Sequence, residues 1–241
     1  MQSILLDIEG TTTPVDFVYR VLFPYARRHV KEFVSRFYGT EGVQADIKQL
    51  RNGHASDQQQ QQTPPAWRDD SIGSQVESVT TYVHWLMDRD RKSTGLKSLQ
   101  GKIWEVGYRS GQLQGQVYED VPPALVRWSE QKKDISIYSS GSVLAQRLLF
   151  QYTKAGDLTR FLQGYFDTTT GPKTEPESYG RIAKALKQPP SEILFISDVI
   201  AELDAANSAG LQTTLCVRSG RPWPQAHSYP VIRSFDEIFP A

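Results

Sequence analysis

The sequence predicts an α/β fold with a parallel sheet, and three observations support this prediction. In the C-terminal half, short apolar runs alternate with segments whose apolar residues recur at helical spacing. Such alternation is typical of parallel strands joined by helices. Residues 4–6 form one more apolar run near the N-terminus, and it ends directly in a pair of carboxylates. A long segment of different character separates that run from the others, so we expect an insertion within the sheet domain.

The predicted elements of the C-terminal half are bounded by ordinary helix signals. Ser142 is placed to cap a helix start, Pro176 suits a first helical turn, and Gly210 follows a helix end. Between these signals the apolar periodicity indicates the type of each element. The predicted strands are 135–138, 193–196 and 213–217, and the predicted helices are 143–150, 176–186 and 199–209.

The segment between the first strand and this half reads as a mostly helical insertion. Pro24 suits the first turn of a helix whose apolar residues continue at helical spacing over 25–37. Helical spacing recurs over 75–87 and 101–118, while the glutamine-rich residues 58–62 indicate a mobile loop. The predicted domains are an α/β core, 1–14 and 127–241, and a helical insert, 15–126.

The composition limits the classes of function. The chain has 241 residues, of which 39% are hydrophobic and 22% charged, as in an ordinary globular protein. The formal net charge of zero gives no reason to expect nucleic-acid binding. No apolar run approaches the ~20 residues of a membrane span, so we expect no membrane partner.

The single cysteine and the start of the chain bear on the cellular compartment. Cys216 cannot form an internal disulfide, and its place in an apolar run predicts a packing role. The first predicted strand begins almost at Met1, which leaves no room for a signal peptide. We therefore expect a cytoplasmic protein. Near-zero net charge without a long heptad run favours a monomer.

Four polar clusters lie just after predicted strands or at the start of a predicted helix, and we expect them at the edge where parallel α/β sheets bind ligands. Asp7 and Glu9 are two residues apart and would point to the same side of an extended chain. Two carboxylates placed together are unfavourable unless they share a cation or a proton. Acids that hold Mg²⁺, groups that bind phosphate oxygens and a carboxylate that attacks phosphorus are what phosphoryl transfer requires. The clusters are Asp7/Glu9/Thr11, Ser139/Ser140, Lys173 and Asp198/Glu202.

The order of these motifs resembles the haloacid-dehalogenase superfamily of phosphatases. Within it, nearly the whole chain is similar to the enolase-phosphatases of methionine salvage. Glu9 favours this subgroup, because most relatives carry aspartate at that position. The resemblance implies a Rossmann-like parallel-sheet core of the haloacid-dehalogenase type with an inserted helical cap. The matching segments are DIEGTTTP at 7–14, LFPY at 22–25, YSSGSV at 138–143, GPKTE at 171–175 and ISD at 196–198.

The resemblance also implies roles for the matched residues. Asp7 is expected to be the nucleophile that forms an aspartyl-phosphate, and a ligand of one Mg²⁺ per chain. Glu9 is expected to bind the metal through its main-chain carbonyl and to act as general acid and base. Asp198 is the third expected metal ligand. Lys173 is expected to balance charge and keep Asp7 ionised. The expected phosphate-binding residues are Thr11, Ser139, Ser140 and Lys173.

The implied reaction has two steps on one substrate, 2,3-diketo-5-methylthiopentyl-1-phosphate. Enolisation gives an enol phosphate, and hydrolysis then releases phosphate and the acireductone 1,2-dihydroxy-3-keto-5-methylthiopentene. The alternative is a Mg²⁺-dependent sugar-phosphate phosphatase without enolase activity. Three acids in metal-holding positions disfavour metal-independent dehalogenation, and no G-x-G-x-x-G follows the first strand to indicate dinucleotide binding. The enolisation base, the role of Glu202 and the residues that select the methylthio tail stay open.

Overall fold

The computed structural model describes residues 1–91, 93–220 and 228–240, and the chain divides into two compact units. The first unit is formed by Met1–Val18 and Gln114–Ala241, and the second by Tyr19–Leu113. One continuous segment is thus inserted into a unit made of two separate segments. The second unit is shorter than the predicted insert of 15–126, because residues 15–18 and 114–126 belong to the first.

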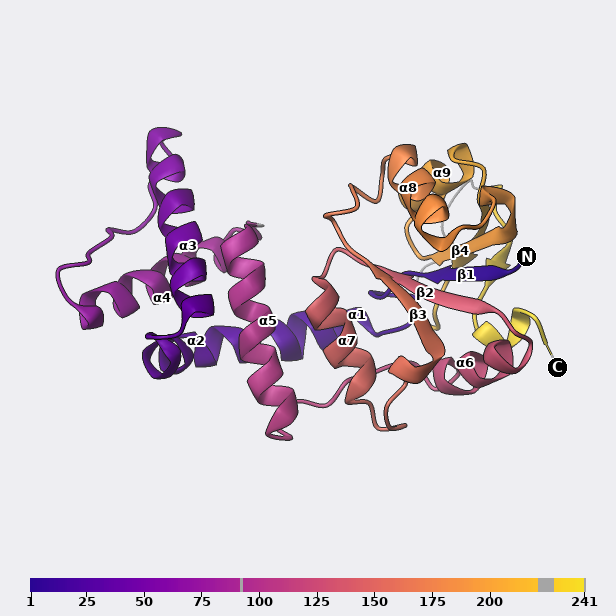
Figure 1. Ribbon diagram of the computed structural model, residues 1–241, viewed down its shortest axis with the longest axis horizontal. Helices are drawn as coiled ribbons and strands as arrows, with labels where there is room; N and C mark the ends of the chain where they lie inside the picture. The colour runs from indigo at the N-terminus through magenta and orange to yellow at the C-terminus, as the bar shows by residue number, and fades with distance from the viewer. Residues whose placement is uncertain (92, 221–227, 241) are drawn as a thin grey trace. The chain divides into compact units, whose positions relative to one another are not determined.

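The first unit is built on a six-stranded sheet in which every neighbouring pair of strands is parallel. The strand order is β3-β2-β1-β4-β5-β6, so the N-terminal strand lies inside the sheet between β2 and β4 (Figure 1). The order reverses beside β1, and sheets of this kind bind ligands beyond the carboxyl ends of the strands at that point. The strands are β1 Ser3–Leu6, β2 Asp134–Tyr138, β3 Leu162–Phe166, β4 Ile193–Ser197, β5 Gln212–Cys216 and β6 Val231–Ile232.

Helices cover both faces of this sheet. Helices α8 and α9 lie on one side of it, and α6 and α7 lie on the other (Figure 1). This two-sided covering explains why the strands read as continuous apolar runs in the sequence. The helices of the first unit are α1 Val15–Phe17, α6 Val121–Glu130, α7 Val143–Gln151, α8 Pro176–Leu186 and α9 Ile200–Ser208. The described 3₁₀ turns of this unit are η2 Thr159–Phe161, η3 Pro190–Glu192 and η4 Phe235–Glu237. A π-helical turn, η1 Val18–Leu22, begins at the last residue of the first segment and continues into the inserted unit.

The core of the first unit lies between the central strands and the helices. Leu5 and Phe195, on adjacent strands, are completely buried with Tyr179 and Ile182 of α8. Cys216 is a free cysteine within this buried sheet, and burial raises the pKa of its thiol to about 12. The predicted packing role of Cys216 is therefore confirmed, since a thiol of such high pKa stays protonated and unreactive.

The second unit is a bundle of four helices in which α2 packs against α4 and α5, and α3 packs against the same two helices. Its helices each bury an apolar stripe, as amphipathic helices do. In α3 this stripe includes Val43, Ile47 and Leu50. The four helices are α2 Phe23–Phe37, α3 Glu41–Gln59, α4 Ile72–Asp88 and α5 Thr94–Arg109.

The structure confirms each predicted strand and helix of the C-terminal half, with bounds that differ by at most a residue or two at each end. Strands β3 and β6 and helices α3 and α6 were not predicted. β3 contains Gly164 and is only partly buried, and β6 has two residues, so neither carries a clear apolar pattern. The apolar residues of α3 recur at helical spacing, but polar and charged residues separate them, so the periodicity is weak.

Two predictions in the insert need correction. The predicted loop at 58–62 begins inside α3, which continues to Gln59. The predicted helix at 101–118 ends at Arg109, because Gly111 takes a positive φ of 76° that a right-handed helix does not allow. Among the described residues, no helix combines the length and the apolar character needed to cross a bilayer.

Candidate active site

The segment after β1, residues 7–13, forms a tight turn that we call the acidic loop. The backbone N–H groups of Thr11, Thr12 and Thr13 all point to the carbonyl of Ile8, at 3.2, 3.0 and 2.9 Å. Gly10 allows this winding, because its φ of +80° is unfavourable for a residue with a side chain. The turn therefore places the side chains of the loop at the carboxyl end of the central strand.

The carboxylate of Asp198 lies against the acidic loop. A Cβ atom added to Gly10 would lie 2.0 Å from Oδ2 of Asp198, so the loop and this carboxylate approach at a distance that only glycine permits. Asp198 directly follows β4, the strand that pairs with β1 at the reversal of the strand order. The two predicted acidic motifs thus meet at the edge where the topology predicts a ligand site.

Lys173 bridges two carboxylates in the buried part of the site. Its Nζ lies 2.5 Å from Oδ1 of Asp7 and 2.6 Å from Oε2 of Glu202. Burial alone would lower the pKa of Lys173, but the charges of Asp7 and Glu202 outweigh burial and raise it, so the lysine stays protonated. The hydroxyl of Tyr179 donates to the carbonyl of Lys173 at 2.7 Å, and that of Ser197 to Glu202 at 2.9 Å. Lys173 is therefore held from both its backbone and its side chain.

Glu9 lies near the same carboxylate of Asp7. Burial, and then the negative charge of Asp7, raise the pKa of Glu9 above its ordinary value, while Lys173 opposes the shift. The hydroxyl of Ser139 donates to Oε2 of Glu9 at 3.4 Å, and that of Thr11 donates to Oδ2 of Asp7 at 3.2 Å. A raised pKa favours the protonated form of Glu9, which is the form that a general acid uses.

The segment after β2, residues 139–142, forms a second loop that we call the serine loop. The N–H of Ser139 donates to the carbonyl of Phe166 at 3.2 Å, and Ser139 Oγ accepts from the N–H of Gly141 at 3.1 Å. The side-chain amide of Gln146 donates to the carbonyls of Gly141 and Phe166, at 2.9 and 2.8 Å. Ser140 follows in the same loop and is partly buried. The contribution of Gln146 was not predicted, because it depends on α7 packing beside the end of β3.

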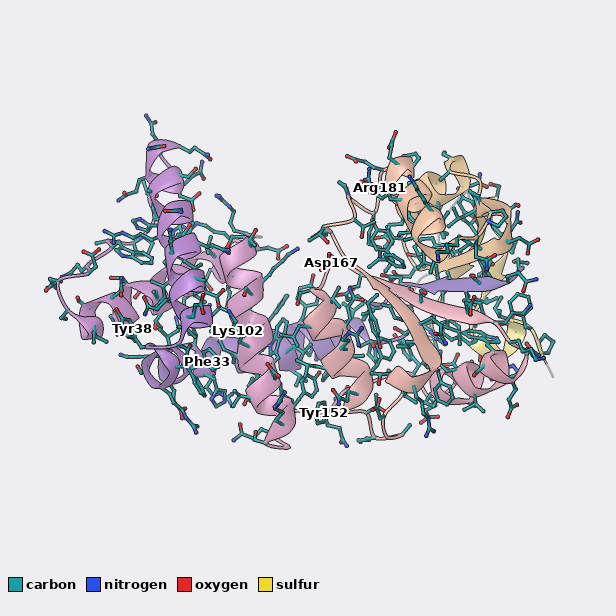
Figure 2. The ribbon with its side chains drawn as sticks, viewed as in Figure 1. Phe33, Tyr38, Lys102, Tyr152, Asp167 and Arg181 are labelled. Atoms are coloured by element: carbon teal, nitrogen blue, oxygen red, sulfur yellow. The ribbon has the colours of Figure 1, made fainter. Side chains whose placement is uncertain are left out.

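The structure also shows which polar residues have structural roles. Asp167, at the end of β3, accepts from the N–H of Val143 at the start of α7, at 3.3 Å, and from Thr169 (Figure 2). In the second unit a cavity of about 300 Å³ is lined in part by Phe33 and Lys102, both labelled in Figure 2. Lys102 pairs with Asp46 at 2.5 Å, so its charge is engaged within the bundle.

The donor set fits a divalent cation that binds partly through the backbone. Among the residues that the structure describes, no three His, Cys, Asp or Glu side chains form a metal-binding group. The predicted set of Asp7, Asp198 and the main-chain carbonyl of Glu9 contains only two such side chains, so this observation is compatible with it. Carboxylate and carbonyl oxygens are the ligands that Mg²⁺ prefers.

Known proteins are similar to this chain over most of its length. The family model described as haloacid dehalogenase-like hydrolase matches residues 1–210. An enolase-phosphatase E1 of Synechococcus elongatus is 52% identical over 236 residues, which cover 98% of this chain and 97% of that protein. The chain belongs to the enolase-phosphatases of the haloacid dehalogenase-like hydrolases.

Two other relatives of this enolase-phosphatase are informative. A protein of Vitis vinifera, whose name joins methylthioribulose-1-phosphate dehydratase to enolase-phosphatase E1, is 46% identical over 98% of this chain. The match covers 47% of that protein. Among solved structures, the UTR4 protein (Unknown transcript 4 protein) of Saccharomyces cerevisiae is 35% identical, with a TM-score of 0.79 over 98% of this chain and 99% of that chain. The predicted fold class is therefore confirmed, as is the predicted family.

Proposed function

We propose that this enzyme converts 2,3-diketo-5-methylthiopentyl-1-phosphate to 1,2-dihydroxy-3-keto-5-methylthiopentene and phosphate in methionine salvage, by enolisation followed by hydrolysis. The observation that carries the proposal is the convergence of Asp7, Glu9 and Lys173 at the carboxyl end of β1. The names of the relatives supply the reaction class: enolase-phosphatase. A plain sugar-phosphate phosphatase would need no enolase step, and none of these names supports it.

The plant relative supports the choice of substrate. Its name places a methylthioribulose-1-phosphate dehydratase and an enolase-phosphatase in one protein. Loss of water from the diol beside the ketone of methylthioribulose-1-phosphate gives an enol that becomes a 2,3-diketone. The product keeps the methylthio tail and the phosphate ester. It is therefore the diketone phosphate that an enolase-phosphatase would take next.

In the phosphatase step, Asp7 is the nucleophile. One of its carboxylate oxygens forms a bond to phosphorus, and the bond from phosphorus to the enol oxygen breaks. Glu9 donates a proton to that leaving oxygen. Glu9 then removes a proton from a water molecule, the water attacks the phosphorus of the aspartyl-phosphate, and Asp7 is released with free phosphate. The raised pKa of Glu9 suits the first of these transfers.

Other residues hold the phosphoryl group and the nucleophile. Lys173 pairs with Asp7 at 2.5 Å and balances charge as it develops on the phosphoryl oxygens. Thr11 and Ser139 are placed beside Asp7 and Glu9, at hydrogen-bond distances of 3.2 and 3.4 Å, and we assign them to the phosphoryl oxygens together with Ser140. In the enolase step, a base removes a proton from the carbon that bears the phosphate ester, and the electron pair moves to the neighbouring carbonyl oxygen as an enolate. Glu9 is our candidate, because the proton it takes is then available for the leaving oxygen, while the enolate oxygen takes its proton from solvent.

We assign one Mg²⁺ per chain to Asp7, Asp198 and the main-chain carbonyl of Glu9. The contact between Gly10 and the Asp198 carboxylate supports this assignment, because it brings the two acidic segments together. When bound, Mg²⁺ neutralises the charge of the phosphate ester and permits an anionic nucleophile to approach it. Without it, the carboxylates beside Lys173 would repel the phosphate.

We further propose that the second unit, Tyr19–Leu113, is a cap that excludes water during the reaction. The aromatic candidates for the methylthio tail are Phe23, Trp104 and Tyr108 in this unit and Phe17 in the first. Trp104 is buried and donates from Nε1 to the carbonyl of Leu22 at 2.8 Å, so part of its role is packing. Closure of an active site excludes water and so prevents side reactions of reactive intermediates.

The test is to follow phosphate release and ultraviolet absorbance in one cuvette, with and without Mg²⁺. We expect Mg²⁺-dependent phosphate release that is preceded by growth of an enol absorbance. Removal of the metal with a chelator should abolish turnover, and added Mg²⁺ should restore it. Phosphate release at equal rates from simple sugar phosphates, with no enol absorbance, would favour the plain phosphatase instead.

The remaining expectations concern the state of the protein in the cell. A monomer is expected to have a mass near 27.3 kDa, the mass of the chain, when light scattering is measured during gel filtration. A metal titration by calorimetry measures the number of Mg²⁺ ions per chain. A cytoplasmic location is tested by fractionation of the cells that express the protein.

A further inference from the structure

A buried arginine outside all the recognised motifs holds the acidic loop. Arg218 follows β5 and is only 4% exposed. Its Nε and Nη2 both donate to the carbonyl of Thr11, at 2.8 and 2.6 Å. The planar guanidinium group presents two parallel donors, and here both are directed to one backbone oxygen of the loop that carries Asp7 and Glu9. A lysine could supply the charge but not this two-pronged contact.

The charge of Arg218 is balanced away from the catalytic carboxylates. Its Nη1 lies 2.6 Å from Oδ2 of Asp120, which also accepts from the N–H of Phe235 at 2.6 Å. The guanidinium group lies over the rings of Tyr118 and Phe235, 4.3 and 4.6 Å from their centres. A buried cation with such partners is stable in its position, whereas an unpaired one would be costly. Asp120 thus fixes the arginine, and the arginine fixes Thr11.

The loop is held on a second side by the same group of residues. The N–H of Tyr118 donates to the carbonyl of Thr12 at 3.0 Å, so consecutive carbonyls of the acidic loop are both engaged. Thr11 in turn donates from its hydroxyl to Asp7. A shift of the Thr11 backbone would therefore move a hydrogen-bond donor of the nucleophile. It would also move the turn at Gly10 that packs against Asp198.

We infer that Arg218 is a positioning residue for phosphoryl transfer: through its paired hydrogen bonds to the Thr11 carbonyl, supported by Asp120, it sets the position of the acidic loop and so of Asp7. The inference rests on the proposed function, because it assigns Asp7 as the nucleophile. Arg218 touches neither substrate nor metal in this account. It acts only through the backbone of the loop.

The chain offers a matched control in Arg127. This arginine also donates to backbone carbonyls of the first unit, from Nε to Phe239 at 3.0 Å and from Nη2 to Phe235 at 2.7 Å. Like Arg218, it contacts the segment around Phe235 and pairs with an acid, Asp236, at 3.7 Å. Among the described residues, its hydrogen bonds and ion pair lie outside the acidic loop. Substitution of Arg127 therefore measures the structural cost of losing such an arginine without disturbing Asp7.

The experiment compares Arg218→Lys with Arg127→Lys. It adds Asp120→Asn, which weakens the support of Arg218 and so its hydrogen bonds to the Thr11 carbonyl. Three quantities are measured: the unfolding midpoint, the kcat and KM for phosphate release, and hydrogen exchange of the amides of residues 10–13. For Arg218→Lys we expect kcat to fall about 10- to 100-fold, since displacement of a reacting group by 1 Å can cost about 100-fold. KM should change less, because other elements bind the substrate. Hydrogen exchange should accelerate in the acidic loop, because the paired hydrogen bonds to the Thr11 carbonyl are lost.

The control and the second variant determine the interpretation. Arg127→Lys should lower the unfolding midpoint while leaving kcat and exchange in the acidic loop unchanged. Asp120→Asn should reproduce the Arg218→Lys pattern at smaller size. Equal kcat and equal loop exchange in the two lysine variants would overturn the inference, as would faster loop exchange without loss of kcat, or loss of kcat without faster exchange. If the unmodified enzyme fails to release phosphate from the diketone phosphate, the proposed function fails, and the exchange comparison still decides whether Arg218 holds the loop.

Discussion

Two groups of buried carboxylates, one in each unit, differ in how their charge is balanced. In the second unit, Asp57 accepts from the hydroxyl of Tyr82 at 2.7 Å and pairs with Arg91 at 2.6 Å. In the first unit, Lys173 is shared between Asp7 and Glu202, and burial together with the charge of Asp7 raises the pKa of Glu9. Matched pairs of the first kind hold a fold together. Carboxylates that outnumber the ammonium group beside them are unfavourable, and proteins keep them where a metal or a proton is to be bound.

The comparison predicts opposite results for Asp7 and Asp57: substitution of Asp7 should lower activity, and substitution of Asp57 should lower stability. Asp7→Asn should lower kcat for phosphate release by roughly 10,000-fold or more, as removal of a catalytic nucleophile does. Lys173 keeps Glu202 as a partner in this variant, so the unfolding midpoint should change little. Steady-state phosphate release and thermal unfolding measure the two quantities. Substantial turnover by Asp7→Asn would remove Asp7 from the role of nucleophile.

Glu9 offers the next largest effect. Glu9→Gln keeps the size of the side chain but cannot donate a proton to the leaving oxygen. Because general acid catalysis contributes about 100- to 10,000-fold, kcat should fall within that range. Removal of one carboxylate from the neighbourhood of Asp7 should not lower the unfolding midpoint. A fall in kcat of less than about threefold would contradict the assignment of Glu9 as the acid.

Glu202 distinguishes a positioning role from metal binding. In the structure Glu202 contacts Lys173, so Glu202→Gln should weaken the ion pair that positions the lysine. We expect kcat to fall by roughly 10-fold, as it does when a residue that supports a group of the site is replaced. The Mg²⁺ concentration that gives half-maximal activity should stay the same, since the metal is assigned to other residues. A rise of tenfold or more in that concentration would instead make Glu202 a metal ligand.

The smallest effect on activity is expected in the second unit. Asp57→Ala should destabilise the bundle by about 1–3 kcal/mol, because it leaves the buried hydroxyl of Tyr82 without its partner. The kcat of the folded variant should be nearly unchanged. Urea unfolding and kinetics at a temperature where the variant is fully folded test this pair of expectations. A large loss of kcat in the folded variant would show that charge in the second unit also serves the reaction.

Much of the fold and of the site could be predicted from the sequence. Strands and helices of the first unit were recognisable, because burial on both faces of a parallel sheet gives short apolar runs and its helices show helical periodicity. Asp7, Ser139 and Asp198 were recognisable because each directly follows such a run. The serine loop, by contrast, depends on Gln146, whose amide reaches the carbonyl of Phe166, 20 residues away in the sequence. No local pattern indicates a contact of that kind.

The sequence by itself thus determined the fold class and the order of the motifs, and it supplied the residues that we propose for the chemistry, because these are properties of neighbouring residues. Only the tertiary structure decided how those residues are held. It pairs Lys173 with Asp7 across 166 positions of the chain, and Arg218 with the carbonyl of Thr11 across 207. These contacts form because parallel strands end at one edge of the sheet, so the segments that follow β1, β3 and β5 meet there. Their strength comes from burial at that edge, where charge is weakly screened and each buried group requires a partner.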